Sequence, residues 1–185
     1  MSLESNTPKD LIVTDLIDTL SNQIVTAHPS LDDVVFVGIL STGFPIAERL
    51  AKRIKDQTQI EVPVGKLDVS LYRDDLIEKG SYITLQQSEI PVNLTDKVVV
   101  LVDDVLFHGR TIRAAMDGIL DFGRPKRIEC AVLIDRGHRE LPIEATYVGE
   151  TISTQSDQYV KVSLLEVEGE DGVILTDESK KKSTI

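Results

Sequence analysis

Three apolar runs, at residues 34–40, 97–104 and 127–135, constrain the fold of this chain more than any other feature. Each is a nearly continuous stretch rich in β-branched residues, which is typical of a strand buried on both faces. Apolar residues at helical spacing follow the first two runs, at 44–55 and 110–123. This alternation predicts an α/β fold, a doubly wound parallel sheet with helices on both faces.

The other segments are expected to extend or cover this sheet. Apolar residues at helical spacing predict a first helix that Thr7 caps and Pro29 ends. Residues 73–94 are polar and lack a clear period, so we expect a loop or a hairpin there. Further strands are expected at residues 62–72, 145–149 and 159–167, the last as an edge strand.

Composition favours a single cytoplasmic domain without a membrane partner. No stretch reaches the roughly 20 apolar residues that span a bilayer, and the N-terminus lacks a secretory pattern. The single cysteine, Cys130, excludes an internal disulfide, and its apolar surroundings predict an inert core thiol. We expect a disordered tail at residues 1–6, one domain at 7–177 and a solvated tail at 178–185.

The charge is strongly negative but unevenly distributed. The formal net charge of -11 disfavours a broad surface for nucleic acid. From Arg110 to Arg139, however, seven Arg or Lys accompany only four Asp or Glu, whereas from Glu144 to Asp171 seven acids accompany one Lys. A locally basic segment in an acidic chain suits a small anionic ligand.

Polar residues lie at the ends of the three apolar runs. They are Ser41, Thr42 and Gly43 after the first run, Asp103 and Asp104 at the end of the second, and Asp135 and Arg136 at the end of the third. Parallel sheets bind ligands at the carboxyl ends of their strands. We therefore expect these residues to converge on one binding site.

The stretch "VVVLVDDVLFHGRT", residues 98–111, indicates what that ligand is. Two adjacent carboxylates at a strand end repel each other unless hydroxyl groups or a hard cation satisfy them. Gly109 then permits a tight turn, and the N–H groups of Gly109, Arg110 and Thr111 would form the N-terminus of a helix, a ready phosphate site. One short loop can thus hold sugar hydroxyls and a phosphate, as a ribose 5-phosphate unit requires.

This stretch resembles the phosphoribosyl-pyrophosphate (PRPP) signature of type I phosphoribosyltransferases. More narrowly, "VSLYRDDL", "EIPVNLTDKVVVLVDDVLFHGRTIRAAMDGILDFGRP" and "VLIDRGHRELPI" resemble the PyrR family over about residues 34–167. Members of that family are uracil phosphoribosyltransferases, and many also regulate pyrimidine operons by binding messenger RNA. The resemblance implies a type I phosphoribosyltransferase-like sheet with a small antiparallel or loop hood.

The resemblance also implies a role for each matching position. Asp103 and Asp104 would hold the ribose 2- and 3-hydroxyls, directly or through Mg²⁺ bound with PRPP, and together with Arg73 are the expected catalytic residues. The 5-phosphate loop would comprise Phe107, His108, Gly109, Arg110 and Thr111. Ser41, Thr42 and Gly43 would form the pyrophosphate loop, and Arg73, Asp74 and Asp75 would begin a flexible loop over the substrate. Asp135 and Arg136 would lie near the base and the metal.

Two departures from the family pattern stand out. Family members commonly read "KTRG" where this chain reads Leu40-Ser41-Thr42-Gly43, so the Lys and Arg that would face pyrophosphate are missing. Either this chain binds pyrophosphate more weakly, or Arg73 supplies the missing positive charge. His108 stands where Thr is common, and an imidazole can still donate to a phosphate.

Plainer interpretations remain for several of these residues. Adjacent acids at a strand end are often a solvated turn, and residues 41–43 could be an ordinary turn in which Thr42 caps a helix. His138 is more typical of a surface loop, and His28, before Pro29, of a structural role. The lysines at 180–182 indicate a solvated tail.

Three functions remain open at this point: an enzyme that makes UMP from uracil and PRPP, an RNA-binding attenuation regulator, and a non-catalytic nucleotide sensor. Base preference follows from the resemblance alone. RNA binding is expected to be weak or absent, because the first helix carries Lys9 against Asp10, Asp15 and Asp18. The expected partners are PRPP and uracil or uridine nucleotides, and the family suggests a homodimer or larger assembly.

Overall fold

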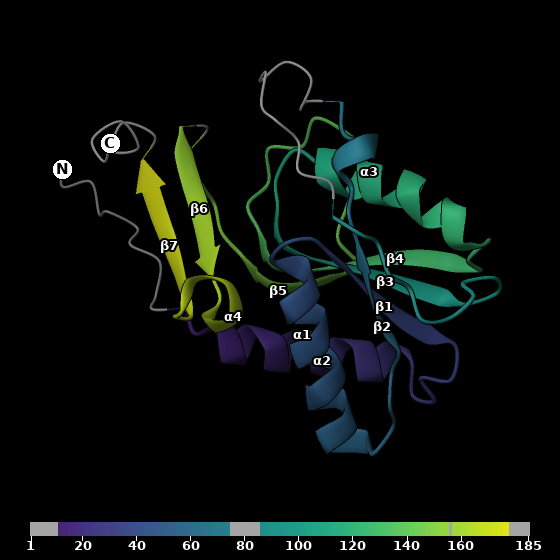
Figure 1. The fold of residues 1–185 in the computed structure, drawn as a ribbon. Coiled ribbons are helices and arrows are strands. Elements are labelled where there is room, and N and C mark those ends of the chain that lie inside the picture. Colours follow the sequence, from purple (N-terminus) through teal and green to yellow (C-terminus); the bar gives the residue numbers. More distant parts are fainter. Residues whose placement is uncertain (1–10, 75–85, 156, 178–185) are drawn as a thin grey trace.

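Five parallel strands form the central sheet, so the predicted architecture is confirmed (Figure 1). The structure is a computed structural model that describes residues 11–74, 86–155 and 157–177. The strands lie in the order β2-β1-β3-β4-β5. Their bounds are β1 Val34–Ile39, β2 Val64–Leu67, β3 Val98–Leu106, β4 Arg127–Asp135 and β5 Tyr147–Thr151.

Helices cover both faces of this sheet (Figure 1). The helices α1 (Val13–Ala27) and α2 (Gly43–Thr58) pack on one face, and α3 (Arg110–Ile119) packs on the other. The predicted cap of the first helix at Thr7 lies outside the described residues. The last turn of the predicted helix at 110–123 is a separate 3-10 turn, η3 (Leu120–Phe122).

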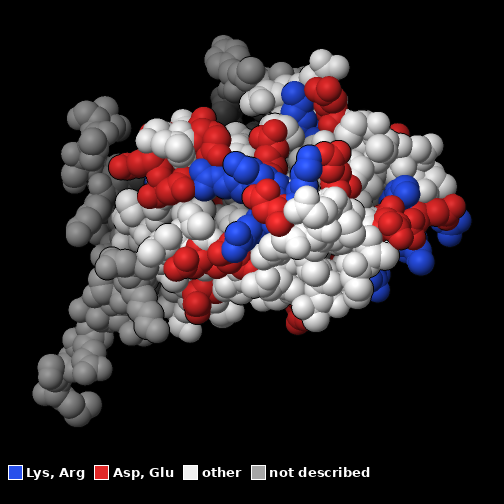
Figure 2. Space-filling view, turned by 90° about the horizontal axis from the view of Figure 1, so that it is seen from below, with Lys and Arg blue, Asp and Glu red and all other residues white. Residues whose placement is uncertain are grey.

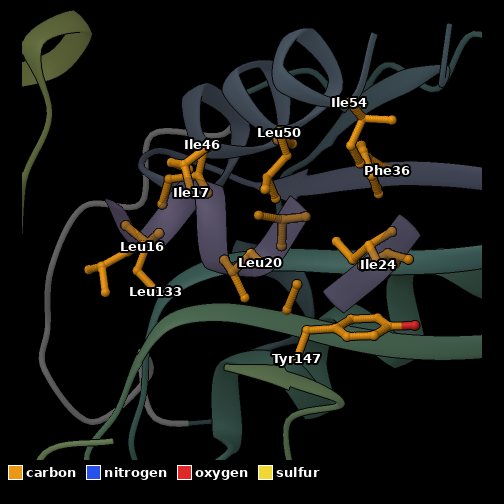
Figure 3. Packing of buried hydrophobic residues seen from close by; sticks show 14 of the residues in the cluster. Leu16, Ile17, Leu20, Ile24, Phe36, Ile46, Leu50, Ile54, Leu133 and Tyr147 are labelled. Carbon is orange, nitrogen blue, oxygen red and sulfur yellow. The ribbon is translucent and has the colours of Figure 1, made fainter. Parts of the chain in front are cut away.

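Two apolar cores, one on each face of the sheet, hold these layers together. Figure 3 shows Leu20 and Ile24 of α1 beside Leu50 of α2 and Phe36 of β1, all of them fully buried. Each such side chain stabilises the fold by about 1.5–3 kcal/mol relative to an exposed one. Successive residues of β3 enter opposite cores, which explains its continuous apolar run: Val98, Val100 and Val102 enter one, and Val99 and Leu101 enter the other.

A small antiparallel sheet forms the expected hood beside the main sheet (Figure 1). It consists of β6 (Gln158–Ser163) and β7 (Gly172–Asp177), with the short helix α4 (Leu165–Glu168) between them. The prediction of one strand over 159–167 was therefore wrong beyond Ser163, and β7 was missed. Arg49 of α2 fixes this turn through hydrogen bonds to Glu166 and Asp171.

The strand predicted at 62–72 is shorter than expected. It ends at Leu67, and the 3-10 turn η1 (Ser70–Tyr72) follows. Glu89, from the segment expected to be a loop or hairpin, forms an antiparallel bridge with Lys66. The peptide bond between Leu40 and Ser41, which links β1 to α2, is cis. Within the described ranges, no helix combines the length and the apolar character that crossing a bilayer requires.

Candidate functional site

The acid pair, Asp103 and Asp104, lies inside β3 rather than at its end. Pairing of β3 with β4 continues as far as Leu106, whereas pairing with β1 stops at Val102. The prediction that the strand ends at Asp104 was wrong, because β4 supports β3 beyond the last residue of β1. The acid pair therefore lies at a step in the sheet, where β1 gives way to the turn that leads into α2.

The two carboxyl groups of the acid pair are poorly solvated, with Asp103 buried and Asp104 half-buried. Asp103 is 7% exposed, and burial together with the negative charge of Asp104 raises its pKa well above the usual value. Burial also raises the pKa of Asp104, although the N–H of Val105 at 2.7 Å and the hydroxyl of Thr42 donate to its carboxylate. The positive charge of Arg73 lowers the pKa of Asp103 and so offsets part of this rise. Hydroxyl donors or a hard cation would relieve this repulsion.

The turn between β1 and α2 packs directly against the acid pair. A Cβ atom on Gly43 would lie 2.2 Å from the carbonyl oxygen of Val102, so only glycine fits there without a shift. Thr42 makes no side-chain cap bond to α2, and its hydroxyl bonds to Asp104 instead. Thr42 thus holds the N-cap position that the plainer interpretation gives it, but its side chain does not cap the helix. Residues 40–43 include no cationic side chain.

Residues Phe107–Thr111, here called the phosphate loop, comprise the tight turn after β3 and the first two residues of α3. Gly109 has a φ of 90°, a left-handed conformation that glycine adopts without strain, and α3 begins at the next residue. The start of a helix leaves N–H groups without helical partners, which suits an anion. A cavity of about 120 Å³ adjoins the loop and is bounded by Arg73, Asp103 and residues 105–112. The loop and one member of the acid pair thus border the same cavity.

Two arginines lie at this cavity. Arg73 donates a hydrogen bond to the hydroxyl of Thr111 at 3.3 Å. Arg110 bonds to Glu140 at 2.7 Å and to Asp74 at 2.8 Å, and these carboxylates raise its pKa. The structure therefore brings Arg73 and Asp74, both predicted for the flexible loop, to the phosphate loop.

Arg136, predicted near the base, is buried between the phosphate loop and the hood. It is 4% exposed, and its guanidinium carbon lies 3.8 Å from the ring centroid of Phe107. It also donates to the carbonyl of Gln158, the first residue of β6, at 2.6 Å. Burial lowers its pKa. His108 stacks on Phe107 as well, with 3.6 Å between the ring centroids.

Asp135, the last residue of β4, precedes Arg136, and its carboxylate forms an ion pair with Arg139. Arg139 donates to it at 2.5 Å. Sequence reasoning missed both Arg139 and Glu140, and the only signal for them was the density of charged residues in "DRGHRE". His138 is exposed, with Nε2 2.8 Å from the carbonyl oxygen of Thr154, as the surface-loop interpretation predicts.

The oxygen donors of the acid pair are suited to a hard cation such as Mg²⁺. Among residues 11–74, 86–155 and 157–177, no three His, Cys, Asp or Glu side chains gather closely enough to hold a metal by themselves. A metal at Asp103 and Asp104 would therefore need further ligands from substrate or water. Asp75 lies outside the described residues.

A larger cavity, about 390 Å³, lies at the opposite end of the sheet. Residues 27–34 line it together with Val98, Lys126 and Arg127. None of the residues predicted for the site borders it. This cavity is larger than the one beside the phosphate loop, but the chemistry of the acid pair and the phosphate loop favours the smaller one.

Comparison with known proteins agrees with this geometry. Residues 9–167 match the family model described as "Phosphoribosyl transferase domain". The chain has the fold of a hypoxanthine-guanine phosphoribosyltransferase from Bacillus anthracis, with a TM-score of 0.64 and 22% identity over 93% of this chain and 99% of that one. A hypoxanthine phosphoribosyl transferase from Trypanosoma cruzi gives a TM-score of 0.69 and 16% identity over 98% and 97% of the two chains.

Similarity in sequence is much higher to proteins named "Bifunctional protein PyrR". The relative from Pelotomaculum thermopropionicum is 50% identical over 84% of this chain and 86% of its own length. Those from Chloroflexus aurantiacus and Thermus aquaticus are 51% and 50% identical over the same shares. This chain therefore belongs to the phosphoribosyl transferase domain family and, within it, to the PyrR family.

Proposed function

We propose that this protein transfers ribose 5-phosphate from PRPP to uracil, giving UMP and pyrophosphate. The observation that carries the proposal is that one cavity is bordered both by a buried carboxylate and by a glycine-containing loop that starts a helix. The carboxylate suits sugar hydroxyls, and the loop suits a phosphate. Membership of the PyrR family supports the choice of chemistry.

In this proposal, the acid pair and the phosphate loop bind the two ends of the ribose 5-phosphate. Asp103 and Asp104 accept hydrogen bonds from the ribose hydroxyls, or hold Mg²⁺ that arrives with PRPP. The metal, when bound, would neutralise charge on the pyrophosphate. The N–H groups around Gly109 bind the 5-phosphate, and Arg73 adds positive charge beside them.

The reaction mainly requires that the protein position the ribose and stabilise the charge that develops on pyrophosphate. The bond between C1 of the ribose and pyrophosphate breaks, and its electron pair leaves with pyrophosphate. A nitrogen of uracil bonds to C1 and releases its proton to solvent. Fixing the ribose at both ends holds C1 in place for this exchange, which can supply much of the rate enhancement. Cationic groups stabilise the charge that develops on the leaving group.

An assay of pyrophosphate release tests this function and its substrate together. Uracil, guanine, hypoxanthine and orotate are supplied in parallel with PRPP and Mg²⁺. We expect release with uracil to exceed release with each other base. Release with a purine instead would show that the base is wrong, and no release with any base would exclude catalysis under these conditions.

A second candidate, a non-catalytic nucleotide sensor, is favoured by one specific observation. Residues 40–43, which adjoin the acid pair, offer a hydroxyl and backbone groups but no cation. A nucleoside monophosphate needs only the phosphate loop and the acid pair, whereas PRPP also needs a place for pyrophosphate. Binding of UMP without turnover of PRPP would support the sensor.

A further inference from the structure

The guanidinium of Arg139, which sequence reasoning did not assign to the site, donates hydrogen bonds to the backbone of the phosphate loop. Its Nη1 group donates to the carbonyl oxygen of Phe107 at 3.0 Å and to that of Leu106 at 3.4 Å. Its Nη2 group donates to Asp135 at 2.5 Å. Its Nε group donates to the carbonyl oxygen of Ile143 at 2.8 Å. One side chain therefore ties the loop to the end of β4 and to the segment that follows.

The backbone beside Arg139 continues this arrangement. The N–H groups of Glu140 and Leu141 both donate to the carbonyl oxygen of His108, at 3.1 and 3.3 Å. The side chain of Ile143 lies close to the loop as well, since a Cβ atom on Gly109 would be 3.3 Å from it. Three consecutive carbonyl groups, those of residues 106–108, thus accept hydrogen bonds from residues 136–141.

The planarity of the peptide bond determines the direction in which the N–H groups of the loop point. In a trans peptide unit the C=O and the N–H point in opposite directions. Fixing the carbonyl groups of residues 106–108 toward the 136–141 segment therefore directs the N–H groups of Phe107, His108 and Gly109 to the other side of the loop. The cavity beside the loop is bounded by these same residues.

We infer that Arg139 is a positioning residue, which orients the N–H groups of the phosphate loop for a 5-phosphate without touching the ligand. The inference rests on the proposed function, because it assumes that this loop binds a phosphate. Arginine suits the role, since its rigid fork offers five donors, whereas a lysine ammonium is a single centre that cannot reach the same set of acceptors at once.

The test compares the affinity of UMP with that of uridine, which lacks the phosphate. Both are measured by calorimetric titration of wild type, Arg139→Met and Arg139→Lys, with uridine followed by displacement where its binding is weak. We expect each variant to lose about tenfold or more in affinity for UMP, or about 1.4 kcal/mol, because N–H groups that turn away from the phosphate no longer donate charge-assisted hydrogen bonds to it. Uridine affinity should stay within about twofold of wild type, so the preference for UMP shrinks.

Arg127→Met is the matched control. It also removes one arginine charge, and Arg127, the first residue of β4, likewise pairs with a carboxylate, that of Glu129, at 2.5 Å, but at the far end of the sheet. Its UMP-to-uridine preference should equal that of wild type. Should Arg139→Met prove unfolded by thermal melting, Arg139→Lys, which keeps the charge beside Asp135, provides the comparison.

Equal losses for UMP and uridine, or an unchanged preference for UMP in a folded Arg139 variant, would overturn the positioning role. Full recovery of the preference in Arg139→Lys would also overturn it, because charge alone would then suffice. A wild-type protein that does not prefer UMP to uridine would instead refute the phosphate loop itself, and the proposed function with it.

Discussion

Gly43 of α2 and Val102 of β3 approach so closely that a Cβ atom on the glycine would lie 2.2 Å from the valine carbonyl oxygen. This contact seats the start of α2 against the strand residue that immediately precedes the acid pair. It keeps the hydroxyl of Thr42 within reach of Asp104. The geometry of the site therefore depends on a position that has no side chain.

Gly43→Ala should consequently damage both stability and ligand binding. Overpacking against backbone that cannot yield costs about 1–3 kcal/mol, and separating α2 from β3 would also disturb the acid pair. Urea unfolding and UMP titration measure the two effects. Gly172→Ala is the control, because a Cβ atom there meets nothing within 4 Å. Wild-type affinity in a folded Gly43→Ala protein would show that this contact does not shape the site.

Asp104→Asn should reduce turnover strongly while leaving the fold intact. The substitution removes a contact to ribose or metal, and a lost charge-assisted hydrogen bond of about 1.5–3 kcal/mol corresponds to a loss of roughly tenfold to a hundredfold in rate. It also relieves the repulsion with Asp103. Steady-state kinetics and thermal melting check the two expectations, and unchanged kinetics would remove the ribose role from this pair.

The dependence of stability on pH gives the same variant a second readout. Burial raises the pKa of both carboxyls, so the folded state binds protons more tightly than the unfolded chain. Stability is then lost as pH rises above the unfolded value of about 4. Asp104→Asn removes one of these charges. The melting temperature of the variant minus that of wild type should therefore be larger at pH 8 than at pH 5.

Leu40→Lys combined with Thr42→Arg should tighten the binding of PRPP and pyrophosphate. The double variant restores cations beside the acid pair, and charge-assisted contacts to phosphate are about twice as strong as neutral ones. Leu40→Gln with Thr42→Gln controls for side-chain size without charge. Affinity for pyrophosphate no better than in this control would mean that Arg73 already supplies the cation or that residues 40–43 do not face the leaving group.

RNA binding at physiological salt is expected to be weak. The helices α1 and α2 lie on the face that Figure 2 shows. Acidic and basic side chains are mixed on this face. Arg53 pairs with Asp18 at 2.6 Å, and Arg49 pairs with Glu166 and Asp171. Paired arginines release few counterions from a phosphate backbone.

A gel-shift titration at about 150 mM salt checks this expectation, because surface charges farther apart than about 8 Å are screened there. The probes are a pyrimidine-operon leader RNA and a scrambled control. Selective submicromolar binding to the leader, modulated by uridine nucleotides, would show that regulation through RNA is retained despite these ion pairs.

The strands and helices could be predicted where local pattern decides structure. The continuous run of β3 predicted a buried strand correctly, and the position of His28 before Pro29 predicted a structural role, which its 2.9 Å contact with Glu129 supports. The end of β3 could not be predicted, since it depends on how far β4 extends alongside. The strand β7 was missed because its short apolar run follows acidic residues that read as loop.

The residues of the candidate site also fall into those that the sequence predicts and those that it does not. Gly109 and the acid pair carry a local chemical signal, so sequence reasoning found them. Arg139 does not, because its partners in the phosphate loop are backbone carbonyl groups more than thirty positions earlier in the chain. A carbonyl group is present at every residue, and nothing in the sequence tells which ones a distant arginine will reach.

The most direct test of the whole account is a thermal shift with UMP and with PRPP, the latter in the presence and absence of Mg²⁺. A ligand at a hundredfold excess over its dissociation constant stabilises the folded state by about 2.7 kcal/mol, or about 5–10 °C for a chain of this size. We predict that UMP raises the melting temperature by such an amount, and that PRPP does so only with Mg²⁺. No shift with either ligand would contradict the assignment of this cavity to a ribose 5-phosphate unit.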